Sequence, residues 1–504
     1  MDMQRENSCW KDYICEFNKN DEELYINDIP NAQALEFLEA QIPIVDLPDK
    51  VIERAYYFRW WTYRKHIKTT REGHVITEFL PTVPWSTTYN AISCPAGFHI
   101  REGRWMKDEE GIVKDYICFW LTFPEKMYSY SSWLAASVEE YCEIHGDWVF
   151  AEEIFEDLEV YFQKRIERSK KDIGLFYSED CEDGMEVSIS GNGLRPTASS
   201  YAYADAMALS RLARRRGLHD KEKLYKDLAK EIKEKMMTLL WTGEFFRTIP
   251  EEYMKESCLS EGIRPVIAPE KSVRELIGYV PWYFGIPEAE KTVVFQELLD
   301  PKTFYSPYGL TVADQSHPRF MEPHRHECLW NGPIWPFATT QVLVALANAV
   351  RDCKNTPQDP RVTGVYRPCK EDYYKLLHQY ASSFRRTLPN GKIVDWIDEN
   401  MDPENGEWLA RRILEGWGFK ESKGGYERGK DYNHSMYCDL VLSGLLGIQA
   451  GVDAQLEVHP LIPDDWEYFR VQNLYFYGRK YEIVFDKDGK HYGEGSGLHI
   501  KRVV

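Results

Sequence analysis

Two acidic stretches about two hundred residues apart carry side chains that are able to perform acid–base chemistry. The first is DGMEVS at residues 183–188, and the second is DENMDPENGE at residues 398–407. Cleavage of a glycosidic bond by water needs one carboxylic acid to protonate the leaving oxygen and a second carboxylate to activate the water. Acidic loops are common, so the residues around each stretch must decide whether this chemistry applies.

Glycines surround the first stretch, in which Glu186 is followed by a Gly-Asn-Gly segment and then by Arg195. Glycine lets the backbone turn sharply and approach a ligand, so Glu186 and Arg195 are expected to project into a cleft. The alternative, given equal weight, is an acidic surface loop in which Arg195 pairs with a neighbouring acid.

The second stretch begins beside a tryptophan, Trp396. An indole packed against a carboxyl group excludes water from it and raises its pKa, which is the usual way to obtain a general acid or a tuned base at neutral pH. The alternative is a solvated turn with Trp396 in the core. A second polar stretch at residues 426–434 contains Glu427, Tyr432 and His434, and Glu427 is a rival for the water-activating group.

Further candidate binding residues lie in three other segments. His326 belongs to HRHE at residues 324–327, which lacks the i, i+4 histidine spacing of a zinc protease and is therefore expected to contact substrate or support its loop. The other candidates are aromatic and amide side chains suited to a sugar: Trp85, Asn90, Trp330, Asn331 and Trp335. The common nucleotide, esterase and calcium motifs are absent, and no metal or organic cofactor is expected.

The composition limits the classes of partner. The chain has 504 residues, a formal net charge of −19 and a sequence pI near 5.3. This charge argues against a nucleic-acid partner, because phosphate binding depends on clustered Lys and Arg. Aromatic residues make up 14% of the chain, which serves a large core and also suits stacking on sugar rings.

The cysteines and the first residues indicate the compartment. Eleven cysteines are spread singly from Cys9 to Cys438 without a close, repeated spacing, which favours free thiols in a reducing compartment. Residues 1–7 lack the basic and apolar regions of a secretory leader, and no apolar run approaches the roughly 20 residues of a membrane span. We therefore predict a soluble, cytoplasmic protein with no membrane partner.

The elements that must position the candidate residues are helices. Apolar residues recur every four positions in segments 150–166 and 224–239, which predicts helices buried on one face. Segments 334–350 and 437–448 are apolar on more than one face, which predicts helices buried on several sides. Further helices are expected near residues 32–41, 48–66, 89–105, 110–122, 131–146, 200–216, 270–281, 288–299 and 370–387.

Long loops between these helices carry most of the candidate residues, at 179–199, 303–332 and 391–431. Loops of this length in a compact domain are usually functional. From residue 456 the pattern changes to short β-prone runs separated by Gly-containing turns, which predicts strands. We expect a helical domain at residues 1–450, including an N-terminal extension at 1–45, and a small β region at residues 451–504 packed on it.

The order of four motifs resembles the (α/α)6-barrel glycosidases of glycoside hydrolase family 63 and the related trehalases of family 37. WSTT at 85–88 is similar to an early Trp-Asp-Thr loop, and DGMEVS resembles an SGWDNS loop whose Asp is the general acid. YGL at 308–310 with WNGPIW at 330–335 resembles YGL followed by YWRGPIW. DENMDPENGE resembles YENYNPxTGE, whose Glu is the general base. Glu186 and Ser86 stand where the family has Asp.

The resemblance implies a mainly α fold, an (α/α)6 toroid of six helical hairpins with a small C-terminal β region. It implies an inverting glycoside hydrolase for an α-linked glucoside or mannoside, with Glu186 as acid, Glu399 as base and the two carboxyls roughly 6.5–9.5 Å apart. Glu427 stays an alternative base, because the trehalases carry theirs in a Gly-Gly-Glu-Tyr stretch. A glycoside phosphorylase, a sugar epimerase or a non-catalytic carbohydrate-binding protein on the same fold also stays open.

Overall fold

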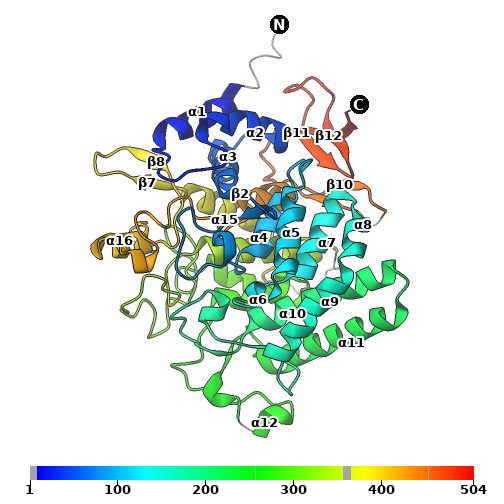
Figure 1. The fold of residues 1–504 in the computed structure, drawn as a ribbon, viewed down its shortest axis with the longest axis vertical. Coiled ribbons are helices and arrows are strands. Elements are labelled where there is room, and N and C mark those ends of the chain that lie inside the picture. Colours follow the sequence, from blue (N-terminus) through cyan, green and yellow to red (C-terminus); the bar gives the residue numbers. More distant parts are fainter. Residues whose placement is uncertain (1–7, 256, 356–364, 452, 504) are drawn as a thin grey trace.

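The computed structural model describes residues 8–255, 257–355, 365–451 and 453–503, and helices dominate them (Figure 1). The prediction of a mainly α protein is therefore confirmed. Residues 1–7, which belong to the predicted N-terminal extension, and Val504 of the predicted β region lie outside the described residues. In the described part of the chain, no helix combines the length and the apolar character needed to cross a membrane.

Six helical segments form an inner ring in which each contacts the next and the last contacts the first. Two of them are composite, because the 3-10 turn η7 runs into α13 and α17 runs into the π-helical turn η10. In chain order the ring is α4 (Ala96–Gly103), α7 (Leu134–His145), α10 (Pro196–Arg215), η7 (Leu276–Tyr279) with α13 (Val280–Tyr283), α14 (Pro336–Asn355), and α17 (Tyr437–Asp439) with η10 (Leu440–Leu445).

A second set of helices packs against the outside of this ring, and Figure 1 shows α11 beyond α10. The outer set is α3 (Lys50–Tyr63), α5 (Ile112–Thr122), α9 (Phe155–Ser169), α11 (His219–Lys235), the 3-10 helix η8 (Ala289–Leu299) and α15 (Lys370–Ser382). Inner α14 and η10 are buried on nearly all sides, as their all-round apolar sequences predict. Outer α11 buries one stripe only.

The buried stripe of α11 differs from the predicted one by one position. Tyr225, Ala229 and Ile232 face α10, whereas Leu224, which was expected on that face, is 59% exposed. The apolar spacing alone does not separate Leu224 from Tyr225, since both fit a helical repeat that ends at Ile232, Leu224 by two steps of four and Tyr225 by a step of four and a step of three. A second difference from the prediction concerns the segment 391–431, which was expected to be a loop. It contains a short helix, α16 (Leu409–Gly416).

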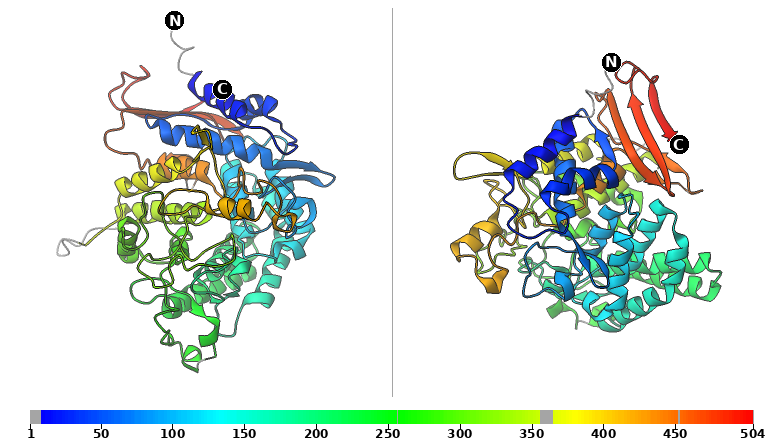
Figure 2. Two further views of the ribbon diagram at one scale, coloured as in Figure 1. Left: turned by 90° about the vertical axis from the view of Figure 1, so that its left-hand side faces the viewer. Right: turned by 45° about the horizontal axis from the view of Figure 1, so that its top comes forward.

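The last strands form an antiparallel sheet that an early strand completes. Strands β11 (Tyr468–Phe476), β12 (Arg479–Asp486) and β13 (Gly497–Arg502) pair in order, and β1 (Ile44–Asp46) pairs with β11. The two residues between β11 and β12, Tyr477 and Gly478, both have positive φ, as a tight hairpin of right-handed twist requires. Figure 2 shows this sheet at the same end of the molecule as α1 (Ser8–Asn20) and α2 (Ala34–Gln41).

A buried carboxylate closes the inner ring. Asp439 of α17 accepts hydrogen bonds from Arg101 Nε at 2.8 Å and Arg104 Nη2 at 2.7 Å on or next to α4, and from the Trp105 indole at 2.8 Å. In return Glu102 accepts from the backbone N–H groups of Cys438 and Asp439 at 3.0 and 2.8 Å. Burial opposes ionisation of Asp439, but the two guanidinium groups outweigh it and hold its pKa well below the usual range.

We predict that Asp439→Asn lowers the free energy of unfolding by about 3–5 kcal/mol at pH 7, because it leaves two buried guanidinium groups without their counter-ion. Since the folded-state pKa is depressed, this stabilisation is present above the unfolded-state pKa of about 4 and is lost as the pH falls below it. Urea unfolding of both proteins at pH 7 and pH 3 measures the difference.

Asp488→Asn is the matched control, since Asp488 lies in an exposed turn and, among the residues with described structure, pairs with Lys490 alone. It should change the free energy of unfolding by less than about 0.5 kcal/mol. Equal effects of the two substitutions at pH 7 would contradict a closing role for Asp439.

Candidate active site

A cavity of about 240 Å³ lies where five loops meet. Each loop leads into an inner helix: Glu78 and Trp85 precede α4, Tyr130 precedes α7, Glu186 precedes α10, residues 326–335 precede α14, and residues 399–434 precede α17. These positions place the cavity at the N-terminal ends of the inner helices. The partial positive charge of those helix ends favours negative groups there.

Seven predicted site residues line this cavity, namely Trp85, Glu186, His326, Trp335, Glu399, Tyr432 and His434. The lining residues that the sequence reasoning did not single out as substrate contacts are Glu78, Phe79, Cys94, Tyr130, Gly184, Glu327, Cys328, Lys423 and Arg428. Both acidic stretches therefore contribute a glutamate to one cavity, although whole helices separate them in the chain.

Glu186 is presented by a tightly turned loop. Gly184 and Val187 have φ of 69° and 65°, and the Glu186 carbonyl accepts the Trp330 N–H at 3.1 Å. Behind Glu186, Asp183 accepts hydrogen bonds from Arg195 at 2.6 Å and from Ser178 at 3.1 Å. Arg195 is fully buried in this ion pair and does not line the cavity. It therefore supports the loop by pairing with a neighbouring acid, which was the alternative to a place in the cleft.

The environment of Glu186 favours its protonated form. Burial is the main cause, and the negative charges of Asp180, Glu399 and Glu78 add to it, so that the pKa rises to about 7. Among the described residues, no cation forms an ion pair with Glu186. A carboxyl group with this pKa is half protonated at neutral pH and can donate a proton there.

Glu399 has a different environment, because a guanidinium group grips both of its oxygens. Arg428 donates from Nε to Oε1 at 2.7 Å and from Nη2 to Oε2 at 2.8 Å, and the Cys328 thiol donates to Oε2 at 3.3 Å. Arg428 also donates to Glu327 at 3.0 Å and lies over the Trp85 ring at 4.8 Å. The fork fixes the orientation of the Glu399 carboxyl group.

Gly429 is needed for this arrangement. A Cβ atom at this position would lie 1.9 Å from Asp398 Oδ1 and 3.3 Å from Glu399 Oε1. Asp398 is buried, accepts the Trp396 indole N–H at 3.3 Å and has a pKa raised to about 7, chiefly by burial and then by the charge of Glu399. The carboxyl next to Trp396 is thus desolvated, but neither Asp398 nor Trp396 lines the cavity.

The rival glutamate lies outside the cavity. Glu427 is buried in a two-pronged ion pair with Arg411, whose Nε donates to Oε2 at 3.2 Å. Its backbone has a φ of 50°, and Glu427 does not line the cavity, whereas Glu399 and Arg428 do. Of the two glutamates considered for the second role, Glu399 is the one at the cavity.

Glu78 and Glu327 are further carboxyl groups in the cavity lining, beside Glu186 and Glu399. Glu78 accepts hydrogen bonds from the Tyr432 hydroxyl at 3.0 Å and lies 2.9 Å from His434 Nδ1. The other ring nitrogen of His434, Nε2, is buried and has no hydrogen-bond partner among the described residues. A buried ring nitrogen without a partner is uncommon in a folded protein. No pattern in the sequence distinguishes Glu78, which follows strand β3 (Gly73–Ile76), from other acids after strands.

Three more predicted residues lie behind the cavity wall. The Asn90 amide donates to the carbonyls of Phe79 and Pro81 and so shapes the loop that carries Trp85. Trp330 stacks on Trp335 with 4.4 Å between ring centroids, and Asn331 donates to the Glu322 carbonyl. Among the described residues, no group of three or more His, Cys, Asp and Glu side chains is arranged to hold a metal ion.

We predict that Glu186→Gln stabilises the fold at alkaline pH. A carboxyl whose folded-state pKa is raised destabilises the fold as the pH rises from the unfolded value of about 4.3 to about 7, and the amide removes that loss. The gain should be about 3–4 kcal/mol at pH 8 and close to zero at pH 4, measured by urea unfolding. Glu182→Gln, in the same loop but outside the cavity, is the control; a pH-independent gain would contradict the raised pKa.

One family model and three solved structures show what this chain is similar to. Residues 88–435 match the family model of the mannosylglycerate hydrolase MGH1-like glycoside hydrolase domain. A solved structure named sialidase is 34% identical with a TM-score of 0.84, over 98% of this chain and 43% of that protein.

Two other solved structures share the fold at low identity. An α-L-rhamnosidase of Streptomyces avermitilis is 11% identical with a TM-score of 0.52, over 88% of this chain and 36% of its own. An uncharacterised conserved protein of Thermus thermophilus is 12% identical with a TM-score of 0.50, over 77% of this chain and 98% of its own. The chain thus spans less than half the length of the sialidase and the rhamnosidase.

Proposed function

Because the chain belongs to the mannosylglycerate hydrolase MGH1-like glycoside hydrolase family, we propose that it hydrolyses an α-linked glucoside or mannoside with inversion at the anomeric carbon. Glu186 is the general acid in this proposal and Glu399 is the general base. The observation that carries it is the pair of glutamates in one cavity, one with a raised pKa and one gripped by a guanidinium fork.

The proposed reaction is a single displacement. Glu186 gives its proton to the glycosidic oxygen as the bond from that oxygen to the anomeric carbon breaks. A water molecule attacks the carbon from the opposite face and gives a proton to Glu399. The products are an alcohol and a sugar of inverted configuration, and proton exchange with solvent returns Glu186 and Glu399 to their starting forms.

The remaining cavity residues suit a sugar ring. Trp85 and Trp335 offer aromatic surfaces, while His434 Nε2 and His326 offer nitrogen atoms for hydroxyl groups. Arg428 contacts both Glu399 and Trp85, so it positions a reacting group and a binding surface together.

We also propose how the chain is built around this site. The closed inner ring and its outer helices are consistent with an (α/α)6 toroid whose site lies at one end of the ring. We retain the division into residues 1–450 and 451–504, with the qualification that strand β1 of the first part pairs with β11 of the second. A cytoplasmic location remains a prediction from the sequence.

The decisive test combines substitution with product analysis. Glu186→Gln and Glu399→Gln should each lower kcat/KM by at least about a thousandfold on α-glucosides or α-mannosides in phosphate-free buffer, because each removes a proton-transfer group. Proton NMR should show the β-anomer as the first product of the wild-type protein. First release of the α-anomer, or dependence of turnover on phosphate, would refute the inverting hydrolase.

Glu427→Gln tests the choice of base. Because Glu427 lies outside the cavity, its amide should retain most of the wild-type kcat/KM once thermal unfolding confirms that the variant is folded. A loss with Glu427→Gln as large as that with Glu399→Gln would reassign the base.

The pH dependence tests the acid. Since Glu186 must be protonated and its pKa is about 7, kcat/KM should fall about tenfold per pH unit above pH 7. A glycosyl fluoride needs little protonation of its leaving group, so its profile should lack this alkaline limb. The same limb with both substrates would show that another group titrates.

A further inference from the structure

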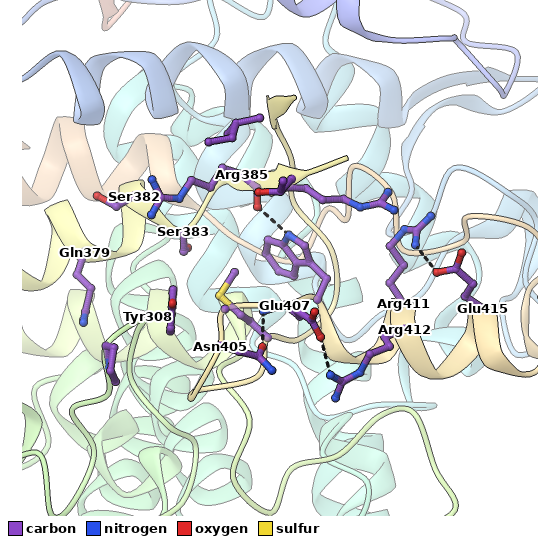
Figure 3. A pocket seen from close by; sticks show the side chains of 17 residues that line it. Tyr308, Gln379, Ser382, Ser383, Arg385, Asn405, Glu407, Arg411, Arg412 and Glu415 are labelled. Carbon is purple, nitrogen blue, oxygen red and sulfur yellow. Dashed lines mark hydrogen bonds and ion pairs between the residues drawn. The ribbon is translucent and has the colours of Figure 1, made fainter. Parts of the chain in front are cut away.

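A second cavity, of about 650 Å³, is distinct from the candidate active site in its lining residues, and Figure 3 shows it from close by. Its walls are the end of α15, the hairpin of β7 (Arg385–Thr387) and β8 (Ile393–Asp395), and the segment that enters α16. The volume falls within the range of small-molecule sites, about 300–1,000 Å³. None of its lining residues also lines the candidate active site.

The lining of this cavity is positively charged in a chain whose net charge is −19. Four arginines line it, against two glutamates. Two of the arginines are neutralised: Arg412 pairs with Glu407, and Arg411 pairs with Glu415 at 3.0 Å and with Glu427. Figure 3 shows the pairs of Arg412 with Glu407 and of Arg411 with Glu415 as dashed lines, and none reaches the guanidinium of Arg385.

Arg385 and Arg386 have no carboxylate partner among the described residues. Arg385 is exposed, and its carbonyl is held by the Trp408 indole N–H at 3.0 Å. The Arg386 guanidinium lies over the Trp396 ring at 4.6 Å. Burial, followed by repulsion from Arg411, lowers the pKa of Arg386, so its charge is incompletely compensated. A bound anion would supply the missing compensation.

The neutral part of the lining fits a sugar ring. Tyr308 and Trp408 contribute aromatic rings, while Ser382 and Asn405 contribute a hydroxyl and an amide. Rings for stacking, polar groups for hydroxyls and a cationic wall together match a sugar that carries an acidic group.

One strand-like segment forms part of both cavities. Glu399 lines the candidate active site, and Met401, two residues later, lines the second cavity. The Met401 backbone exchanges two hydrogen bonds of 2.9 Å with Ile334, next to Trp335. The segment that carries Glu399 and Met401 therefore contributes to both cavities and is held to the loop before α14.

We propose that the second cavity is a non-catalytic binding site for a sugar bearing a carboxylate or phosphate group. The anionic group follows from Arg385 and Arg386, whose planar guanidinium groups bind either oxyanion in a fork. The sugar part rests on the proposed function and on the neutral lining.

Calorimetric titration of the full chain with D-glucuronate and with glucose 6-phosphate tests this site. At least one of them should bind, and the tighter one identifies the anion. Arg385→Gln should weaken that binding about tenfold, because it removes one guanidinium group that binds the anion. Arg385 is exposed, so the substitution should leave the fold intact. The double variant Arg385→Gln, Arg386→Gln should weaken the binding further. Arg479→Gln, which removes an exposed arginine from β12, should leave it unchanged.

Three results would overturn the proposal. These are no binding of either ligand at about 10 mM, equal binding by wild type and Arg385→Gln, and equal weakening by Arg479→Gln. Inorganic phosphate and neutral glucose should both bind more weakly than glucose 6-phosphate. If inorganic phosphate binds equally well, the site does not recognise the sugar. If glucose binds equally well, the site does not recognise the anion. Hydrolysis is assayed separately, so a protein that binds glucuronate through Arg385 but hydrolyses nothing refutes the proposed function alone.

Discussion

The arrangement of this protein depends on one buried ion cluster, in which Asp439 of α17 is held by Arg101 and Arg104 at α4. Charges in a protein interior cost free energy unless each is fully paired, and here the indole of Trp105 and the Ser443 hydroxyl complete the pairing. The cluster joins the last inner helix to the first. It thereby keeps the loops that precede α17 and α4, which carry Glu399 and Glu78, next to each other at the cavity.

Arg428 has the corresponding role inside the cavity. One guanidinium group fixes Glu399, pairs with Glu327 and lies over Trp85, so three loops that enter different inner helices meet at a single side chain. A guanidinium suits this position because its planar fork binds a carboxylate in one orientation and stacks on an indole. The two glutamates of the proposed mechanism differ because Arg428 reaches Glu399, whereas Glu186 lies among other acids.

The sequence was informative where a property is local. All-round apolar segments identified the buried inner helices, short β-prone runs identified the final strands, and the ordered motifs led to a family resemblance that the family model confirms. The motifs also located Glu186 and Glu399, which share one cavity. Their assignment as acid and base stays a proposal.

Contacts between residues far apart in the chain could not be predicted from the sequence. Glu78 and Arg428 carry no signal of their own, since their importance comes from contacts that only folding creates. Arg195 and Glu427 were ambiguous for the same reason, and each proves to be buried in an ion pair.

The pairing of β1 with β11 bears on the order of folding. β1 is synthesised early, whereas β11 emerges only after nearly all the helices have been made. Contacts between such distant segments form slowly, because the chain entropy of closing the loop must be overcome first. Until β11 has been made, the backbone of Ile44–Asp46 lacks its strand partner. Because this strand is short, its exposed edge offers little backbone for pairing with another chain. The sheet of β1, β11, β12 and β13 therefore cannot form until the helices between β1 and β11 have been made.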